Sequence, residues 1–129
     1  MTMPHAVIWM DHREAHIVEF ALDEHHEHKV RQHGGPRALH RQASSVGSGN
    51  APVDHKYFDE VVAALGDTRE ILIAGPGTAK IEFKADLDAR HKAVADRVVG
   101  VETLDHPSDK QLLAFAKKYF VRVDNMLGD

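Results

Sequence analysis

The chain has 129 residues, of which 43% are hydrophobic and 28% are charged, and it contains no cysteine. This length supports one packed core and is too short for two ordinary domains, so we expect a single domain over residues 1–129. The absence of cysteine excludes disulfides, thiolate zinc sites and a cysteine nucleophile. The formal net charge of −4 argues against a protein that coats nucleic acid by bulk charge.

The charge is unevenly spread along the sequence. Positions 28–53 form a 26-residue stretch without a carboxylate, and this stretch holds Lys29, Arg31, Arg37 and Arg41. It therefore carries +4, whereas the other residues, with 12 basic and 20 acidic groups, carry −8. The histidines are concentrated as well, since eight of the eleven fall before residue 50.

Three strands are predicted near the start of the chain. Residues 6–10 are apolar on both faces of a period-2 pattern, residues 14–22 form a second strand, and residues 26–32 form a more polar third strand. Polar turn residues separate these segments, which indicates an antiparallel meander. Residues 33–53 are rich in Gly, Ser and Pro and poor in large apolar side chains, so we expect a flexible basic loop of about 20 residues there.

The following residues change to helical periodicity. The expected elements, in chain order, are a helix over 54–65, a strand over 70–74, a helix over 78–91, a strand over 98–103 and a helix from 108 onward. Asp54 is a suitable N-cap for the first helix, and Ser108 with Gln111 matches a capping box for the last. The apolar face of the second helix follows Ile81, Ala85 and either Leu87 or Asp88. The order βββ-loop-αβαβα predicts an α/β fold with a mixed sheet and flanking helices.

Two kinds of side chain could carry chemistry. Asp11 follows the first strand, the position of a metal-holding acid in nucleases of the ribonuclease H type, although an aspartate there can also bond its own backbone in a turn. His26 and His28 share one face of the third strand and are candidate metal ligands, although no His-Glu-x-x-His spacing accompanies them. The alternative for these histidines is a solvated polar edge strand. Because neither pattern has the residue spacing of an established catalytic or metal site, we expect no catalytic residue, metal site or cofactor.

A glycine-rich turn separates the strand over 70–74 from the helix over 78–91. Gly75-Pro76-Gly77-Thr78 lacks the Lys-Ser/Thr ending of a P-loop and the GxGxxG of a dinucleotide fold, so a nucleotide site is not expected. Lys80 and Lys84 lie one helical turn apart and could present charge to a nucleic-acid backbone. The alternative is a pair of exposed lysines with no partner.

The same turn carries a resemblance to a known family. Residues 71–84, ILIAGPGTAKIEFK, are similar to the strand-turn-helix of the middle domain of archaeal and eukaryotic peptide-chain release factors and of Pelota, and residues 6–15, AVIWMDHREA, resemble the first hairpin of that domain. Over about residues 5–127 the chain is most similar to bacterial stand-alone relatives grouped as release-factor-like or "translational machinery" proteins. The resemblance implies a ribonuclease H-like mixed sheet with flanking helices.

The resemblance also implies a functional role for the long loop over residues 33–53. In release factors the corresponding region carries Gly-Gly-Gln, which enters the peptidyl-transferase centre and helps place the water that hydrolyses peptidyl-tRNA. The nearest match here is Gly34-Gly35-Pro36, and proline has neither a side-chain amide nor a backbone N–H to donate. The resemblance therefore implies a Pelota-like domain without this motif, and the chain length leaves no room for a codon-reading domain.

We therefore expect a translation-associated domain that binds the ribosome or tRNA, has no catalysis of its own and works in the cytoplasm. The residues expected to contact RNA are Lys29, Arg31, Gly34, Gly35, Arg37, Arg41, Lys80 and Lys84. One alternative is a hydrolase that acts on peptidyl-tRNA or RNA through Gly34-Gly35 or Asp11. A second alternative is a histidine-rich domain that binds metal or another protein.

Two further expectations concern partners. No apolar run approaches the roughly 20 residues that a membrane-spanning helix needs, and the first residues lack the pattern of a signal peptide, so we expect no membrane partner. The third strand, over 26–32, has an unpaired edge in the predicted meander, which would allow homo-oligomers to form by strand pairing.

Overall fold

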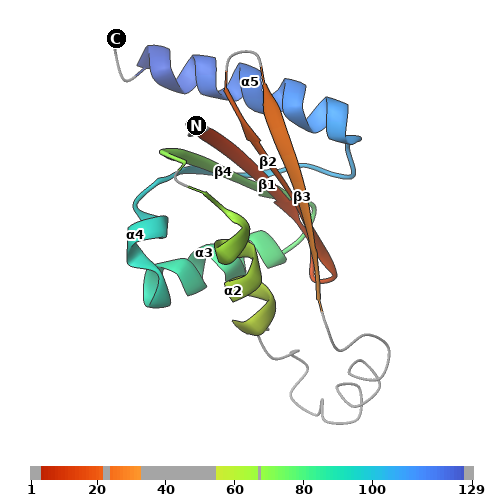
Figure 1. Ribbon diagram of the computed structural model, residues 1–129, viewed down its shortest axis with the longest axis vertical. Coiled ribbons are helices and arrows are strands. Elements are labelled where there is room, and N and C mark those ends of the chain that lie inside the picture. The colour runs from red at the N-terminus through yellow and green to blue at the C-terminus, as the bar shows by residue number, and fades with distance from the viewer. Residues whose placement is uncertain (1–3, 22–23, 33–54, 67, 127–129) are drawn as a thin grey trace.

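A computed structural model of the chain describes residues 4–21, 24–32, 55–66 and 68–126 (Figure 1). The elements, in chain order, are β1 (His5–Met10), β2 (Glu14–Phe20), β3 (His25–Arg31), α2 (His55–Ala64), β4 (Glu70–Gly75), α3 (Ala79–Arg90), α4 (Lys92–Ala95), β5 (Val98–Thr103) and α5 (Asp109–Met126). The expected loop over 33–53 and the expected N-cap Asp54 lie outside the described residues.

The strands form one five-stranded mixed sheet in the order β3-β2-β1-β4-β5. β1 pairs antiparallel with β2, and β2 pairs antiparallel with β3, which is the expected meander. β4 joins the other side of β1 in parallel, and β5 joins β4 in parallel, because α3 and α4 return the chain between them. The mixed sheet with flanking helices confirms the predicted α/β fold class.

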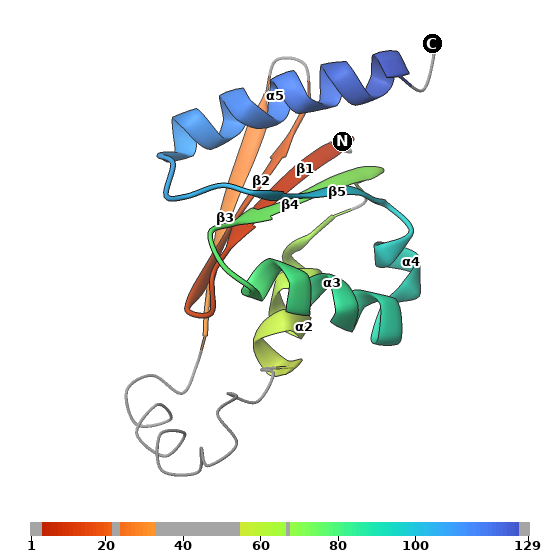
Figure 2. The ribbon, with the colours of Figure 1, turned by 180° about the vertical axis from the view of Figure 1, so that it is seen from behind.

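Helices cover both faces of the sheet. α5 crosses one face, whereas α2, α3 and α4 lie against the other (Figures 1 and 2). Successive side chains of a strand point to opposite faces, so Ile8 packs with Phe58 and Phe83 beneath α2 and α3, and Trp9 packs with Phe120 beneath α5. β1 and β4 are therefore buried on both faces, which is why their sequences read as continuous apolar runs.

The segment between β5 and α5 is fastened to the sheet by a tryptophan and a capping box. The Trp9 indole Nε1–H donates to the carbonyl oxygens of Leu104, at 3.0 Å, and Asp105, at 2.6 Å. The Ser108 backbone N–H donates to Gln111 Oε1 at 2.9 Å, and the Gln111 backbone N–H donates to Ser108 Oγ at 3.1 Å. These reciprocal bonds confirm the predicted start of the last helix.

The buried face of α3 differs from the expected one. Ile81 is 57% exposed and Ala85 and Asp88 are also exposed, so the predicted face is wrong at these positions, whereas Leu87, the alternative to Asp88, is buried as expected. The buried residues are Ala79, Lys80, Phe83, Asp86 and Leu87. The large side chains of Phe83 and Leu87, one turn apart, decide which side of the helix meets the sheet, and two charged residues are buried beside them. None of the helices in the described ranges is long and apolar enough to cross a membrane.

Candidate nucleic-acid interface

The basic stretch begins in β3, where its side chains are exposed to solvent. The Arg31 side chain is 73% exposed, with its Nε 3.8 Å from a Glu14 carboxylate oxygen. Lys29 is also exposed and lines a shallow hollow together with Asp109 at the start of α5. The other residues predicted on this stretch, Gly34, Gly35, Arg37 and Arg41, lie outside the described residues.

The two lysines of α3 do not form a common exposed pair. Lys80 is only 6% exposed, and its ammonium group donates to the carbonyl oxygen of Gly77 in the preceding turn. Lys84 is partly exposed and pairs with Asp88 one turn later, at 2.9 Å. The expectation that both lysines present charge to a nucleic acid is therefore corrected for Lys80. Its ammonium group binds a carbonyl of the strand-to-helix turn and does not face solvent.

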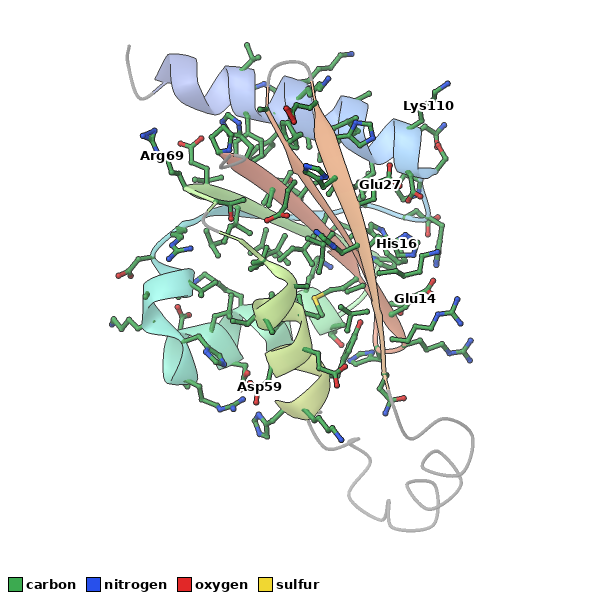
Figure 3. All side chains as sticks on the ribbon, viewed as in Figure 1. Glu14, His16, Glu27, Asp59, Arg69 and Lys110 are labelled. Carbon is green, nitrogen blue, oxygen red and sulfur yellow. The ribbon has the colours of Figure 1, made fainter. Side chains whose placement is uncertain are left out.

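A second basic surface follows α5, and no sequence motif pointed to it. Its exposed cations are Lys110, Lys117, Lys118 and Arg122. Figure 3 shows Lys110 at the beginning of this helix, well away from the end of β3 that leads into residues 33–54. The signal was present in the sequence, because residues 110–123 contain no carboxylate. This basic run does not show when the charges of all residues outside 28–53 are added into a single net charge of −8.

The candidate acid Asp11 acts as a turn residue in the structure. Its Oδ1 accepts hydrogen bonds from the backbone N–H groups of Arg13, at 2.8 Å, and Glu14, at 3.0 Å. Its carbonyl oxygen accepts a third bond from the Tyr57 hydroxyl at 2.9 Å. Among the described residues, the one group of three close metal-ligating side chains does not include Asp11. The geometry supports the backbone-bonding alternative for this carboxylate.

The candidate metal ligands His26 and His28 lie on the exposed strand β3. His28 Nε2 is 3.2 Å from Glu19 Oε1, and the second carboxylate oxygen of Glu19 accepts the backbone N–H of Gly66 at 2.7 Å. Through these two contacts the buried Glu19 connects β3 and the end of α2 to β2. In the described part of the chain, His26 and His28 belong to no group whose ligand atoms converge on one point.

One group of potential metal ligands does converge, between α2 and α3. Asp59, Asp86 and His91 bring their ligand atoms within 4.8 Å of one another. Arg90 lies between the two carboxylates, with Nη2 2.9 Å from Asp59 Oδ2 and Nη1 3.0 Å from Asp86 Oδ2. The guanidinium supplies the positive charge that two adjacent carboxylates need, and a metal ion would have to displace it.

This group is an ion-pair network that joins two helices. The Asp86 side chain is only 4% exposed and also lies 2.9 Å from Nδ1 of His55, the first residue of α2. The hydrogen bond from Arg90, followed by that from His91, holds the pKa of Asp59 below its ordinary value. The same bonds to Asp59 and Asp86 raise the pKa of Arg90. The network therefore fixes where α2 begins, directly after the segment over 33–54.

A further polar cluster centres on His16 in β2 (Figure 3). Its Nδ1 lies 3.2 Å from Asp109 Oδ1 and its Nε2 lies 3.3 Å from Glu14 Oε2. Hollows of about 190 Å³ and about 110 Å³ lie on its two sides. The contact with Asp109, the first residue of α5, fastens the start of this helix to β2.

Comparison with known proteins identifies the fold through solved structures alone. No protein-family model matches the chain, and none of the curated proteins does. Archaeoglobus fulgidus Pelota superposes with a TM-score of 0.62 at 18% identity over 88% of this chain, and Thermoplasma acidophilum Pelota with 0.61 at 22% identity over 88%. The archaeal translation termination factor aRF1 superposes with 0.58 at 16% identity over 87%.

These three proteins share one fold with this chain and are much longer than it. The matched part covers 30% of the first Pelota, 31% of the second and 32% of aRF1. The chain thus spans about a third of the length of the structures that it matches. At these identities the comparison establishes the architecture, in agreement with the resemblance noted at residues 71–84.

Proposed function

We propose that this chain is a stand-alone bacterial relative of the release factor and Pelota middle domains, and that it binds the ribosome or tRNA in the cytoplasm. The observation that carries the proposal is the fold, which 87–88% of the chain shares with two Pelota proteins and with a translation termination factor. The strand-turn-helix over 71–84 supports the proposal separately, because its resemblance to those domains lies in the amino acids themselves.

We assign the contact with RNA to the basic stretch, residues 28–53. Its cations Lys29, Arg31, Arg37 and Arg41 would meet phosphates, and Gly34 with Gly35 would let the backbone approach closely. Neutralising phosphates with lysine and arginine releases counterions, so the affinity should fall steeply with salt. Lys29 and Arg31, the cations of this stretch that the structure describes, are exposed to solvent, which supports this role.

The proposed domain acts without its own catalysis. Pro36 stands where the resemblance places the glutamine of Gly-Gly-Gln, and it cannot donate a hydrogen bond from either its side chain or its backbone. Asp11, the other catalytic candidate, has a carboxylate oxygen that already accepts two backbone N–H bonds. Binding that positions or blocks RNA is the activity that this residue set supports.

The experiment that tests the proposal is cosedimentation with bacterial ribosomes at low salt, using the full chain. The wild type should cosediment, and a variant with Arg31, Arg37 and Arg41 changed to serine should lose about ten-fold or more of its affinity, since three phosphate contacts are removed. Absence of cosedimentation by the wild type at low salt would contradict the proposal.

The basic surface of α5 offers a control of equal charge. Changing Lys117, Lys118 and Arg122 to glutamine removes the same three positive charges from exposed positions in another part of the fold. This variant should keep most of the wild-type affinity. If it loses as much as the first variant, the binding depends on overall charge, and if it alone loses affinity, α5 is the contact and the assignment to residues 28–53 is wrong.

A further inference from the structure

We propose that two copies of this chain associate through β3, which pairs antiparallel with β3 of the second copy in one defined register. The two sheets then become one continuous sheet around a two-fold axis. This inference rests on the strand itself and does not require the proposed function, although Lys29 and Arg31 belong to both proposed contacts.

β3 is a regular edge strand of seven residues. Among the described elements it pairs with β2 alone, at the border of the sheet (Figure 1). Its register with β2 is unbroken over seven residue pairs, and it contains neither proline nor glycine. Bulges, prolines and short length are three of the means by which proteins prevent edge-to-edge pairing, and β3 has none of these three. The opposite edge differs, because the register between β4 and β5 shifts at Ile71 and Leu72.

The direction of the backbone groups limits how a second strand can dock. The backbone N–H of Ala21 donates to the carbonyl of Glu24, and that of Gln32 donates to the carbonyl of Arg13. Hydrogen-bonded pairs alternate along an antiparallel ladder, so the even-numbered residues from 24 to 32 direct their backbone groups toward β2. The odd-numbered residues 25, 27, 29 and 31 direct theirs outward. A second strand must therefore oppose odd residues to odd residues.

Charge selects among the remaining registers. Two central registers place Glu27 opposite Glu27 or Lys29 opposite Lys29 of the second copy, and like charges directly opposite each other repel. The register between them places Glu27 opposite Lys29 twice, once on each side of the axis. His28 then lies opposite His28, and the outer pairs set His25 against Arg31. Charges on an edge strand ordinarily oppose pairing, but in this register Glu27 and Lys29 attract each other at both sides of the axis.

Cysteine cross-linking tests this register, because the chain has no cysteine of its own. In the proposed dimer the two copies of residue 28 form a non-hydrogen-bonded pair, with Cα atoms about 4.5 Å apart. This separation is within the range of about 4.4–6.8 Å that a disulfide spans. His28→Cys should therefore form a disulfide-linked dimer in high yield under mild oxidation. Glu27→Cys and Lys29→Cys, which face themselves only in the other two registers, should form little disulfide-linked dimer.

Charge reversal tests the ion pairs without a covalent link. Glu27→Lys should weaken the dimer by at least about ten-fold in sedimentation velocity, because two attractive pairs become repulsive. Lys29→Glu should do the same, and the double variant Glu27→Lys/Lys29→Glu should restore the wild-type association. Both residues are exposed, so the variants should keep the wild-type circular dichroism spectrum.

Three results would overturn the inference. The first is a wild type that remains monomeric at every concentration with a His28→Cys variant that does not cross-link. The second is equal cross-linking at positions 27, 28 and 29, which indicates random collision. The third is a dimer that neither single charge reversal affects, which places the interface elsewhere on the molecule.

Discussion

Asp86 shows how one buried carboxylate can decide the arrangement of two helices. Its Oδ2 accepts a hydrogen bond from Arg90 Nη1 of the same helix at 3.0 Å, and its Oδ1 lies 2.9 Å from His55 Nδ1 of α2. A buried carboxylate is stable only when its charge and lone pairs are satisfied, so these partners account for an acidic residue on the inner face of α3. His55 is 31 positions away from Asp86 in the sequence, which is why no local pattern predicted the burial of Asp86.

Replacing this carboxylate should cost more than replacing an exposed neighbour on the same helix. We expect Asp86→Ala to lower the free energy of unfolding by about 1–3 kcal/mol, because hydrogen bonds to charged groups are lost at a buried position. Asp88 pairs with Lys84 in solvent, so Asp88→Ala should change stability by less than about 0.5 kcal/mol. Urea unfolding of the two variants measures the difference, and equal effects would mean that the network does not stabilise the fold.

Asp59 should make stability depend on pH at the acidic end. Its pKa is lowered in the folded chain, chiefly by the hydrogen bond from Arg90, so the folded state favours the ionised carboxylate. The contribution is present above the ordinary carboxyl pKa and is lost as the pH falls through the lowered value. Asp59→Asn should thus be less stable than the wild type at neutral pH, and the difference in melting temperature should shrink on acidification. A difference that stays constant down to low pH would contradict this assignment.

The strand-to-helix turn after β4 depends on one glycine and tolerates change at another. A Cβ at Gly75 would lie 2.2 Å from the backbone oxygen of Met10, whereas a Cβ at Gly77 would meet nothing within 4 Å. Gly75→Ala should therefore destabilise by about 2 kcal/mol or more, since a backbone atom of the adjacent strand cannot move aside. Gly77→Ala should change stability by less than about 0.5 kcal/mol. Thermal unfolding of the two variants checks this, and similar melting temperatures would contradict it.

The start of α5 provides a prediction about capping. Ser108→Ala should lower the free energy of unfolding by about 1 kcal/mol, because the side-chain acceptor for the Gln111 backbone N–H is removed. Gln111→Glu should retain the capping box, since glutamate accepts the same bond from the backbone N–H of Ser108. Urea unfolding of both variants tests the box, and a stable Ser108→Ala protein would show that the helix start is held mainly by Trp9 and Asp109.

Local patterns predicted the elements well and their buried faces less well. The strand over 98–103 and the capping box at Ser108 lie where they were predicted, because a run of β-branched residues and a helix cap are local signals. The inner face of α3 was misassigned because apolar Ile81 is exposed while Lys80 is buried. The long aliphatic stem of a lysine can pack against the core while its ammonium finds a carbonyl, and composition does not reveal which lysine does so.

At the scale of the whole molecule, the charge of the chain separates into distinct regions. The charge of +4 on residues 28–53 and the run without carboxylates over 110–123 are both visible in the sequence, and the structure shows that Lys117 and Lys118 of the second run are exposed on α5. Three-dimensional contacts also explain the ion-pair network and the His16 cluster, whose members come from separate elements. Such clusters depend on strand order and helix placement, which a charge profile along the sequence does not contain.

The two cores on either side of the sheet should unfold together. They share β1 and β4, whose alternate side chains enter both, so loss of one core exposes the strands that hold the other. Leu87 lies in the core beneath α3 and Leu112 in the core beneath α5, and both are fully buried. Each Leu→Ala change should cost about 2–5 kcal/mol of unfolding free energy.

The single tryptophan allows this coupling to be measured, because Trp9 lies only in the core beneath α5. Urea unfolding followed by Trp9 fluorescence should coincide with unfolding followed by far-ultraviolet circular dichroism in the wild type and in both variants. In particular, Leu87→Ala should shift the fluorescence transition as far as it shifts the circular dichroism transition, although residue 87 lies on the other face of the sheet from Trp9. A Leu87→Ala variant that loses helical signal while Trp9 fluorescence keeps the wild-type midpoint would mean that the two faces unfold independently.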